Sequence, residues 1–188
     1  MINNTNYPVH FGAKHIQTLK YTDKHTFSHE KVAFVEINPK STLDTTTIKT
    51  LTNEWNDAPY VKAIHEDVLE LRKEKPKINS KIFALTKQNK NYKNLESRQI
   101  LGIVEVSNKN KQTAYIEYLQ VDPLMKKARV GTNILNILKQ MHNSIELHSA
   151  DSALEFYTKN GFEIIDHIRL GCKWIKTEPQ KSFFRKFI

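Results

Sequence analysis

Three strand-like segments in the middle of the chain, followed by a helix, constrain the fold most. Residues 81–87 (KIFALTK), 99–107 (QILGIVEVS) and 113–121 (TAYIEYLQV) are rich in β-branched and aromatic residues, which favour strands. The polar stretch SNKNKQT between the last two is typical of a hairpin turn. A stripe of apolar residues at helical spacing then predicts a helix: Val130, Ile134, Ile137, Leu138 and Met141. A hairpin centre within this order predicts an α+β sheet.

The flanking segments extend the pattern in both directions. In chain order we expect a strand at 31–39, helices at 41–55 and 59–76, and, after the central helix, a strand at 144–150, a helix at 152–160 and strands at 162–166 and 168–176. The predicted order β-α-α-β-β-β-α-β-α-β-β indicates a mixed, largely antiparallel sheet with helices on both faces. Residues 1–28 are interpreted as a polar arm with at most one short strand, and residues 29–188 as a single domain.

The charge balance favours an anionic partner without identifying it. The chain has 29 Lys and Arg against 20 Asp and Glu, a net charge of +9, which would attract a nucleotide cofactor, a nucleic acid or an acidic protein. The lysines are spread along the chain and form no long basic block. RNA binding therefore stays open, beside the plainer interpretation of a solvated lysine-rich surface.

The cysteine, histidine and apolar residues indicate where the protein is located and whether it binds a metal or a membrane. The single cysteine, Cys172, cannot form an internal disulfide and lies in the apolar segment LGCKWI, so we expect it in the core. No apolar run reaches the roughly 20 residues that cross a bilayer, and the first residues do not resemble a secretory signal. The eight histidines show no metal-ligand spacing. We expect a cytoplasmic protein with no membrane contact and no metal.

The segment VDPLMKKARVGT, residues 121–132, has the composition of an anion site. It passes from a predicted strand end through three cationic residues to Gly131 and a predicted helix. The first amides of a helix lack intrahelical partners, and the helix dipole adds positive potential. Glycine lets a phosphate approach the backbone, although an ordinary strand–helix turn has the same appearance. The absence of G-x-x-x-x-G-K-[ST] and G-x-G-x-x-G argues against the two commonest nucleotide-binding loops.

Two motifs follow one another within residues 100–166. The first is YLQVDP followed by KKARVG, and the second is ALEFYTKNGF, residues 153–162. With these motifs the segment resembles the GNAT superfamily of acetyl-CoA-dependent N-acetyltransferases. The first motif is similar to the family's strand end and its Q/R-x-x-G-x-G/A turn, with Arg129 at the usual first glycine and Gly131 at the last, and the second is similar to its A-x-x-[FL]-Y-x-K-x-G-F helix. Ala150 stands where the family often has an asparagine, and Ser149 or Ser152 could replace it.

The resemblance implies a cofactor site and a catalytic acid. The backbone of Leu119, Gln120 and Val121 would pair with the pantetheine arm of acetyl-CoA, and the Val121 amide would stabilise the oxyanion. The pyrophosphate would be held by seven residues: Lys126, Lys127, Ala128, Arg129, Val130, Gly131 and Thr132. Tyr157 would protonate the leaving thiolate, because a phenol and a thiolate have comparable basicity.

The resemblance leaves the general base and the acceptor open. Glu117 is our first candidate for the base and Glu105 the second, with an exposed strand glutamate of no chemical role as the alternative. The acceptor would be a primary amine in a pocket formed by residues 41–76 and 168–178. The alternative function is a catalytically weak or inactive CoA-binding or adaptor module, possible partners being RNA or a second copy of the chain.

Overall fold

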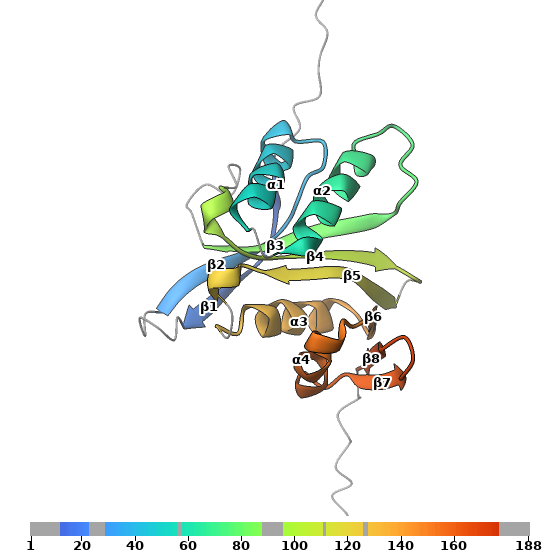
Figure 1. Cartoon of the computed structure of the whole chain (residues 1–188). Coiled ribbons are helices and arrows are strands. Elements are labelled where there is room, and N and C mark those ends of the chain that lie inside the picture. Colours follow the sequence, from blue (N-terminus) through green and yellow to red (C-terminus); the bar gives the residue numbers. More distant parts are fainter. Residues whose placement is uncertain are drawn as a thin grey trace, which may run out of the picture.

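The computed structural model consists of one eight-stranded sheet with helices on both faces (Figure 1). It describes residues 12–22, 29–55, 58–87, 96–110, 112–125 and 128–176. The strands are β1 (Lys14–Thr22), β2 (His29–Glu36), β3 (Ser80–Lys87), β4 (Ile100–Asn108), β5 (Thr113–Val121), β6 (Ser144–His148), β7 (Glu163–Asp166) and β8 (Gly171–Ile175). Their order is β1-β2-β3-β4-β5-β6-β8-β7, and every neighbouring pair is antiparallel except β5 and β6. The predicted fold class is confirmed.

Two layers of helices cover the sheet (Figure 1). The α-helices are α1 (Thr42–Glu54), α2 (Pro59–Leu71), α3 (Val130–Met141) and α4 (Leu154–Lys159), and short 3-10 helices occur at Ser97–Gln99, Pro123–Met125 and Asp151–Ala153. One core lies under α1 and α2 and includes Ile48, Val61 and Ile64; the other lies under α3 and includes Ile134 and Leu138. Each such fully buried side chain contributes about 1.5–3 kcal/mol of hydrophobic stabilisation.

The N-terminal strand extends the sheet beyond the predicted domain. The one short strand allowed for residues 1–28 is β1, which is nine residues long and pairs with β2 from Lys14↔Glu36 to Thr22↔His29. The sheet therefore begins before residue 29. Residues 1–11 and 23–28 of the predicted arm lie outside the described residues.

The second helix is shorter than its sequence pattern predicts. We expected it to continue to Pro76, but α2 ends at Leu71. The five residues that follow Leu71 (RKEKP) are all exposed. With no apolar side chain to bury, these residues gain nothing from packing, which supplies most of the stability of a protein helix.

The edge of β5 opens beyond the middle of the strand. The register to β4 passes from Glu105↔Tyr118 to Val106↔Ile116, so Glu117 is the extra residue of a β-bulge. On the other side, β6 pairs with β5 from Thr113↔Ser144 to Ile116↔Leu147. The last five residues of β5 continue beyond this pairing beside β4, which leaves one edge of the strand open towards α3 and α4.

Candidate active site

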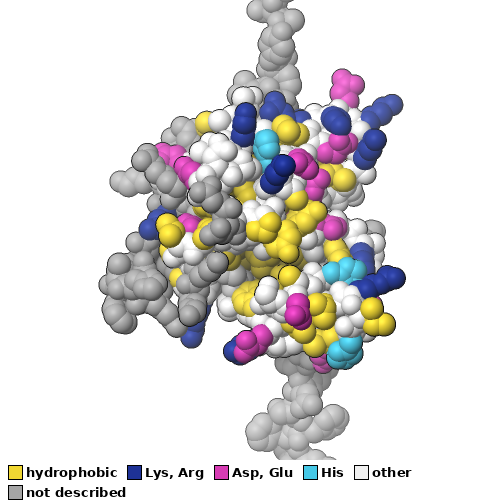
Figure 2. All heavy atoms as spheres, viewed as in Figure 1, with side chains coloured by type: hydrophobic (Ala, Val, Ile, Leu, Met, Phe, Trp, Pro, Cys, Tyr) yellow, Lys and Arg dark blue, Asp and Glu magenta, His cyan; other side chains and the backbone are white. Residues whose placement is uncertain are grey.

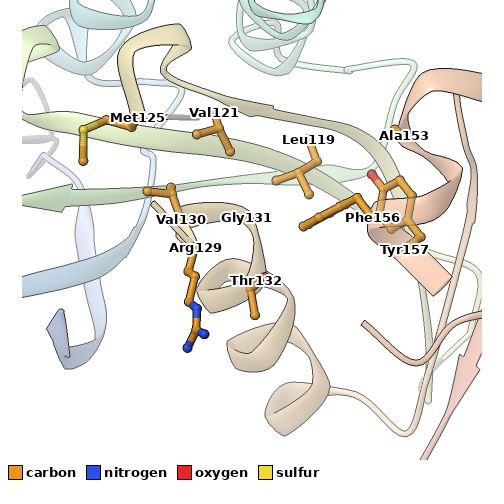
Figure 3. Close-up of a pocket in the computed structure, with 10 residues that line it drawn as sticks. All are labelled: Leu119, Val121, Met125, Arg129, Val130, Gly131, Thr132, Ala153, Phe156 and Tyr157. Carbon is orange, nitrogen blue, oxygen red and sulfur yellow. The ribbon is translucent and has the colours of Figure 1, made fainter. Parts of the chain in front are cut away.

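An apolar cavity of about 350 Å³ lies where β5 ends and α3 begins (Figure 3). It is lined by the end of β5, the turn that follows, the first turn of α3 and the start of α4: Leu119, Val121, Met125, Arg129, Val130, Gly131, Thr132, Ala153, Phe156 and Tyr157. The fold therefore brings most of the residues predicted for cofactor binding, together with the predicted acid, around one space. Ala128 is buried beside the cavity, while Lys126 and Lys127 lie outside the described residues.

The first amides of α3 are available to a ligand. The Asn133 amide donates the first intrahelical bond, to the Arg129 carbonyl at 2.9 Å, so the amides of Val130, Gly131 and Thr132 precede the helical ladder. No side chain caps this end of the helix. Because α3 is twelve residues long, its dipole adds positive potential at the same place. This terminus has the geometry that binds phosphate groups.

Arg129 adopts a left-handed backbone conformation at the N-cap of α3, with φ 60° and ψ 14°. A non-glycine residue pays roughly 1–2 kcal/mol for this conformation, which glycine adopts at no steric cost. The side chain is exposed and, in Figure 3, runs away from Leu119 and Phe156. The chain therefore makes at Arg129 the backbone turn that glycine makes most easily, and places a cation at the rim of the cavity.

Gly131 is required by a close contact between two helices. A Cβ atom at this position would lie 2.9 Å from Cζ of Phe156 and 3.6 Å from Cγ2 of Val121. The first of these distances is too short for carbon atoms, so the Phe156 ring packs directly on the glycine backbone. Any larger side chain at Gly131 would displace this ring into the cavity that it lines.

The open edge of β5 presents alternate backbone groups to the cavity side. The Asp122 amide donates to the Leu101 carbonyl at 3.0 Å, towards β4. Because successive amides of a strand point in opposite directions, the amides of Val121 and Leu119 point away from β4, towards the opening between β5 and β6. The Gln120 side chain donates to the Val121 carbonyl at 3.0 Å, so this acceptor is partly occupied.

Tyr157 stands at the far end of the cavity with its hydroxyl directed towards the side of Leu119 and Phe156 (Figure 3). The residue is 8% exposed, and its ring packs edge-on against those of Phe156 and Phe162. Burial raises the pKa of the phenol well above its ordinary value, with smaller contributions from Cys172 and Tyr60. Tyr157 therefore holds its proton at neutral pH, and the raised pKa makes it a weaker acid towards a thiolate than an unburied phenol.

The two candidate bases lie together in a second cavity of about 320 Å³, on the α2 side of the sheet. Asp67, Ile78, Asn79, Ser80, Glu105, Ser107, Glu117 and Tyr118 line this cavity. Glu117 is exposed and accepts a hydrogen bond from the Ser107 hydroxyl at 2.5 Å. The bulge in β5 allows Glu117 to share this cavity with Tyr118, its neighbour in sequence.

Glu105 is almost fully buried in this second cavity, with 1% of its surface exposed. Its Oε1 accepts a hydrogen bond from the Ser80 hydroxyl, whereas Oε2 has no hydrogen-bond partner. Burial raises the pKa of this carboxyl to about 8; the bond from Ser80 opposes the rise and the nearby Asp67 adds to it. Glu105 therefore holds a proton at neutral pH in the free protein.

Tyr60, on α2, packs beside the second cavity. Its ring stacks on that of Tyr118 with centroids 5.7 Å apart, and Tyr118 lines the second cavity. Tyr60 is also close enough to Tyr157 to contribute to the raised pKa of that phenol. Figure 2 shows hydrophobic side chains gathered across the middle of this view, between the helices above the sheet and those below it.

Sequence reasoning missed several residues of these cavities. Phe156 stands inside the ALEFYTKNGF motif, and its place beside the predicted acid was the available signal. Met125 and Ala153 carry no chemical signal of their own. In the second cavity Ser80 and Tyr118 are contributed by β3 and β5, and only the three-dimensional register brings them to Glu105.

The serines considered as replacements for the usual asparagine make no contact with the first cavity. The Ser149 hydroxyl donates to the Ala150 carbonyl at 2.7 Å, and the Ser149 amide donates to the Leu170 carbonyl at 2.9 Å. Ser152 is exposed in the short helix before α4. Neither residue lines the first cavity.

Comparison with known proteins identifies the family. Residues 65–176 match the family model described as an acetyltransferase (GNAT) domain, which covers more than half of the chain. The chain therefore belongs to the GNAT acetyltransferase family, and the resemblance seen in its two motifs is confirmed. No curated protein matches the chain.

Solved structures from three organisms share the fold. A Desulfovibrio desulfuricans protein assigned to the GNAT family has a TM-score of 0.55 and 11% identity, over 77% of this chain and 98% of that one. The Campylobacter jejuni N-acetyltransferase PseH, in complex with acetyl coenzyme A, has a TM-score of 0.52 and 17% identity, over 77% of this chain and 99% of that one. The Thermoplasma acidophilum PaiA N-acetyltransferase, in complex with coenzyme A, has a TM-score of 0.52 and 15% identity, over 77% of this chain and 99% of that one.

The described residues were also compared with the requirements of a membrane span and of a metal site. No helix among them is long and apolar enough to cross a membrane. In the same residues, no group of three or more His, Cys, Asp or Glu side chains is arranged to hold a metal ion.

Proposed function

We propose that the protein is an N-acetyltransferase that transfers the acetyl group of acetyl-CoA directly to a primary amine within a ternary complex. One observation carries the proposal: a single cavity brings together the free amides at the start of α3, the open edge of β5 and the buried hydroxyl of Tyr157. Phosphate, amide and thioester groups occur in this order along acetyl-CoA. The complexes of the Campylobacter and Thermoplasma proteins support the same cofactor.

Each part of the cavity suits one part of acetyl-CoA. The pyrophosphate would accept hydrogen bonds from the amides of Val130, Gly131 and Thr132, with countercharge from Arg129 and from the predicted Lys126 and Lys127. The pantetheine amides would pair with the backbone of residues 119–121 as an additional strand. Ala128, buried behind the turn, would support the turn rather than contact the ligand.

The transfer step requires an acid for the sulfur and a site for the oxyanion. The nitrogen lone pair of the amine forms a bond to the thioester carbonyl carbon, and the π electrons of the carbonyl move to its oxygen, near the Val121 amide. When the tetrahedral intermediate collapses, the C–S bond breaks and the sulfur takes the proton of the Tyr157 hydroxyl. The surplus proton on the nitrogen leaves to a base, and solvent returns a proton to Tyr157.

Glu117 is the residue that we assign as the base. It is exposed and lies in the cavity on the acceptor side of β5, whereas Glu105 already carries a proton below pH about 8. A base must be deprotonated to accept the proton of an ammonium. Replacing Glu117 by Gln should lower kcat by about 10²–10⁴ and leave the affinity for acetyl-CoA unchanged.

Titration calorimetry with acetyl-CoA tests the cofactor site. Wild-type protein should release heat at a stoichiometry of one, and Gly131→Trp should not bind, because the new side chain would fill the cavity. Asn136→Trp is the matched control, since it adds the same side chain to the exposed face of α3. Absence of binding by the wild type would overturn the proposal.

The runner-up is a catalytically weak or inactive CoA-binding module, and the backbone strain at Arg129 is the observation that favours it. This module would bind acetyl-CoA but release no CoA with any amine offered. If the net charge instead serves RNA, binding to bulk RNA would weaken steeply as salt is raised. CoA release distinguishes the enzyme from the inactive module, and the salt dependence of RNA binding tests the RNA partner.

A further inference from the structure

The acid cavity, defined by Asp67, Glu105 and Glu117, is built to receive a positive charge. Its three carboxyl groups come from α2, β4 and β5 and line one space. No ion pair among the described residues involves any of the three: the recorded pairs join Lys73, Lys81, Lys109, Lys159 and Lys173 to other glutamates. No cation among the described residues therefore balances Asp67 and Glu117, and Glu105 adds a buried carboxyl that holds a proton in the free protein.

Glu105 supplies an independent sign of a missing ligand. A carboxyl oxygen that is buried without a hydrogen-bond donor costs about 1–3 kcal/mol or more, and proteins rarely leave such a group unpaired. Oε2 of Glu105 is in this state, in a side chain that is 99% buried and lines the cavity. Asp67 is the group that faces Glu105, and two carboxyl groups pair only through a shared proton. An ammonium that enters the cavity would replace this proton, donate to Oε2 and pair with Asp67.

The surroundings favour an organic cation over a metal ion. No cluster of acidic or His and Cys side chains in the described residues has an arrangement that could hold a metal. The Tyr118 ring lines the cavity and stacks on Tyr60, and aromatic faces attract ammonium groups through their negative quadrupole. Carboxylates beside tyrosine rings are the surroundings that an alkylammonium prefers.

The acid cavity lies beside the reacting centre. Tyr118 faces it, and the next residue of β5, Leu119, faces the cavity that contains Tyr157. Tyr60 stacks on Tyr118 and contributes to the raised pKa of Tyr157. The ladder to β6 ends at Ile116, before these residues, so a flexible molecule of a few carbon atoms would run past the open edge of β5 from one cavity to the other.

Resting on the proposed acetyl transfer, we infer that the acid cavity binds a second ammonium group of the acceptor, which is a small aliphatic diamine or polyamine. One amino group is acetylated beside Tyr157, while the other is held by Glu105 and Asp67. The charge of the second group, rather than the length of the carbon chain, determines which amines are accepted.

Three amines with the same four-carbon chain test the inference in a CoA-release assay. The second end is cationic in 1,4-diaminobutane, neutral in n-butylamine and anionic in 4-aminobutanoate. We expect kcat/KM for the diamine to exceed that for butylamine by about 10- to 100-fold, the effect of one hydrogen-bonded charge, and 4-aminobutanoate to be the poorest. Equal values for the diamine and butylamine would overturn the inference.

Glu105→Gln locates the effect in the acid cavity. The replacing amide can accept the Ser80 hydrogen bond and donate to Asp67, so the fold should be retained. We expect the ratio of kcat/KM values, diamine over butylamine, to fall about tenfold or more towards one. Glu163→Gln, an exposed acid on β7, should leave the ratio unchanged. An unchanged ratio in Glu105→Gln would overturn the assignment.

Direct binding separates this inference from the proposed function. Calorimetry with 1,4-diaminobutane and no acetyl-CoA should show binding to wild type that weakens about tenfold or more in Glu105→Gln. Binding without acetylation of any amine would retain the diamine site and overturn the transfer reaction. Acetylation of butylamine with no preference for the diamine would retain the transfer reaction and overturn the diamine site. Acetylation of a lysine-containing tripeptide but not of the diamine would overturn a small polyamine as the acceptor.

Discussion

Arg129 accommodates a departure from the family motif in its backbone. Its left-handed conformation retains the turn at the start of α3, and its exposed side chain leaves the cavity open. The sequence showed that a glycine was replaced, but not whether the turn would survive. That outcome depends on the packing of Ala128 and Val130 on either side, both of which are buried.

Arg129→Gly should stabilise the protein. Glycine removes the roughly 1–2 kcal/mol cost of the left-handed conformation and loses part of the gain to backbone entropy, so the free energy of unfolding should rise by about 0.5–1 kcal/mol. Urea denaturation measures it. Arg129→Ala, which removes the charge but keeps the strain, is the control; equal stability of the two variants would contradict the explanation.

Tyr157→Phe should separate chemistry from binding. Loss of the hydroxyl removes the proton donor for the thiolate, so kcat should fall by about 10²–10⁴, while calorimetry shows an unchanged affinity for acetyl-CoA. The ring contacts with Phe156 and Phe162 do not need the hydroxyl. A variant with full kcat would exclude Tyr157 as the acid.

Glu105 should make stability fall as pH rises. Its pKa is near 4.5 in the unfolded chain and about 8 in the folded one, so the folded state retains a proton that the unfolded state loses between these values. The stabilisation from this group is complete below pH about 4.5 and is lost as pH approaches 8. Four groups face Glu105: Asp67 from α2, Glu117 and Tyr118 from β5, and Ser80 from β3.

Urea denaturation at pH 5 and pH 8.5 checks this prediction against Glu105→Gln, whose amide does not titrate. Between these pH values the wild type should lose about 1–4 kcal/mol relative to the variant. The comparison within each pH cancels the contribution of Asp44, another buried carboxyl whose pKa is raised. Parallel pH profiles would show that Glu105 is not protonated in the folded state.

Periodicity was sufficient to predict most elements. Residues 113–121 form β5 as predicted, and the apolar stripe from Val130 to Met141 coincides with α3. What periodicity could not show is pairing. The bulge at Glu117, the end of the β5–β6 ladder at Ile116 and the contact of Phe156 with Gly131 depend on residues distant in sequence. The motifs therefore located the cofactor cavity. For the acid cavity the sequence indicated Glu105 and Glu117 as candidate bases, but not that they share one space with Asp67.

The start of α1 is set by a local interaction. Ser41 is the N-cap, and its hydroxyl accepts a hydrogen bond from the Asp44 amide at 3.2 Å. Ser41→Ala should cost about 0.5–2 kcal/mol of unfolding free energy, measured by urea denaturation. Thr46→Ala, on the exposed side of the same helix, should cost nothing, and an equal loss in both variants would contradict the capping role.

For the whole molecule, cofactor binding should appear as thermal stabilisation. A ligand at 100 times its Kd adds about 2.7 kcal/mol to the folded state, which for a chain of this size raises Tm by about 5–10 °C. Differential scanning fluorimetry with acetyl-CoA measures the shift. Gly131→Trp should show none, and a shift in that variant equal to the wild type would place the ligand elsewhere.

The short ladder between β5 and β6 has a mechanical consequence. Four residue pairs join the two strands, so the sheet consists of an N-terminal group, β1 to β5, and a C-terminal group, β6 to β8, with few hydrogen bonds between them. Such a boundary allows the smaller group to open without unfolding the larger one. In hydrogen exchange, the amides of β7 and β8 should exchange before those of β3 and β4. A ligand bound between β5 and β6 should slow the exchange of β7 and β8 selectively, because it would join the two groups of strands where the ladder is short.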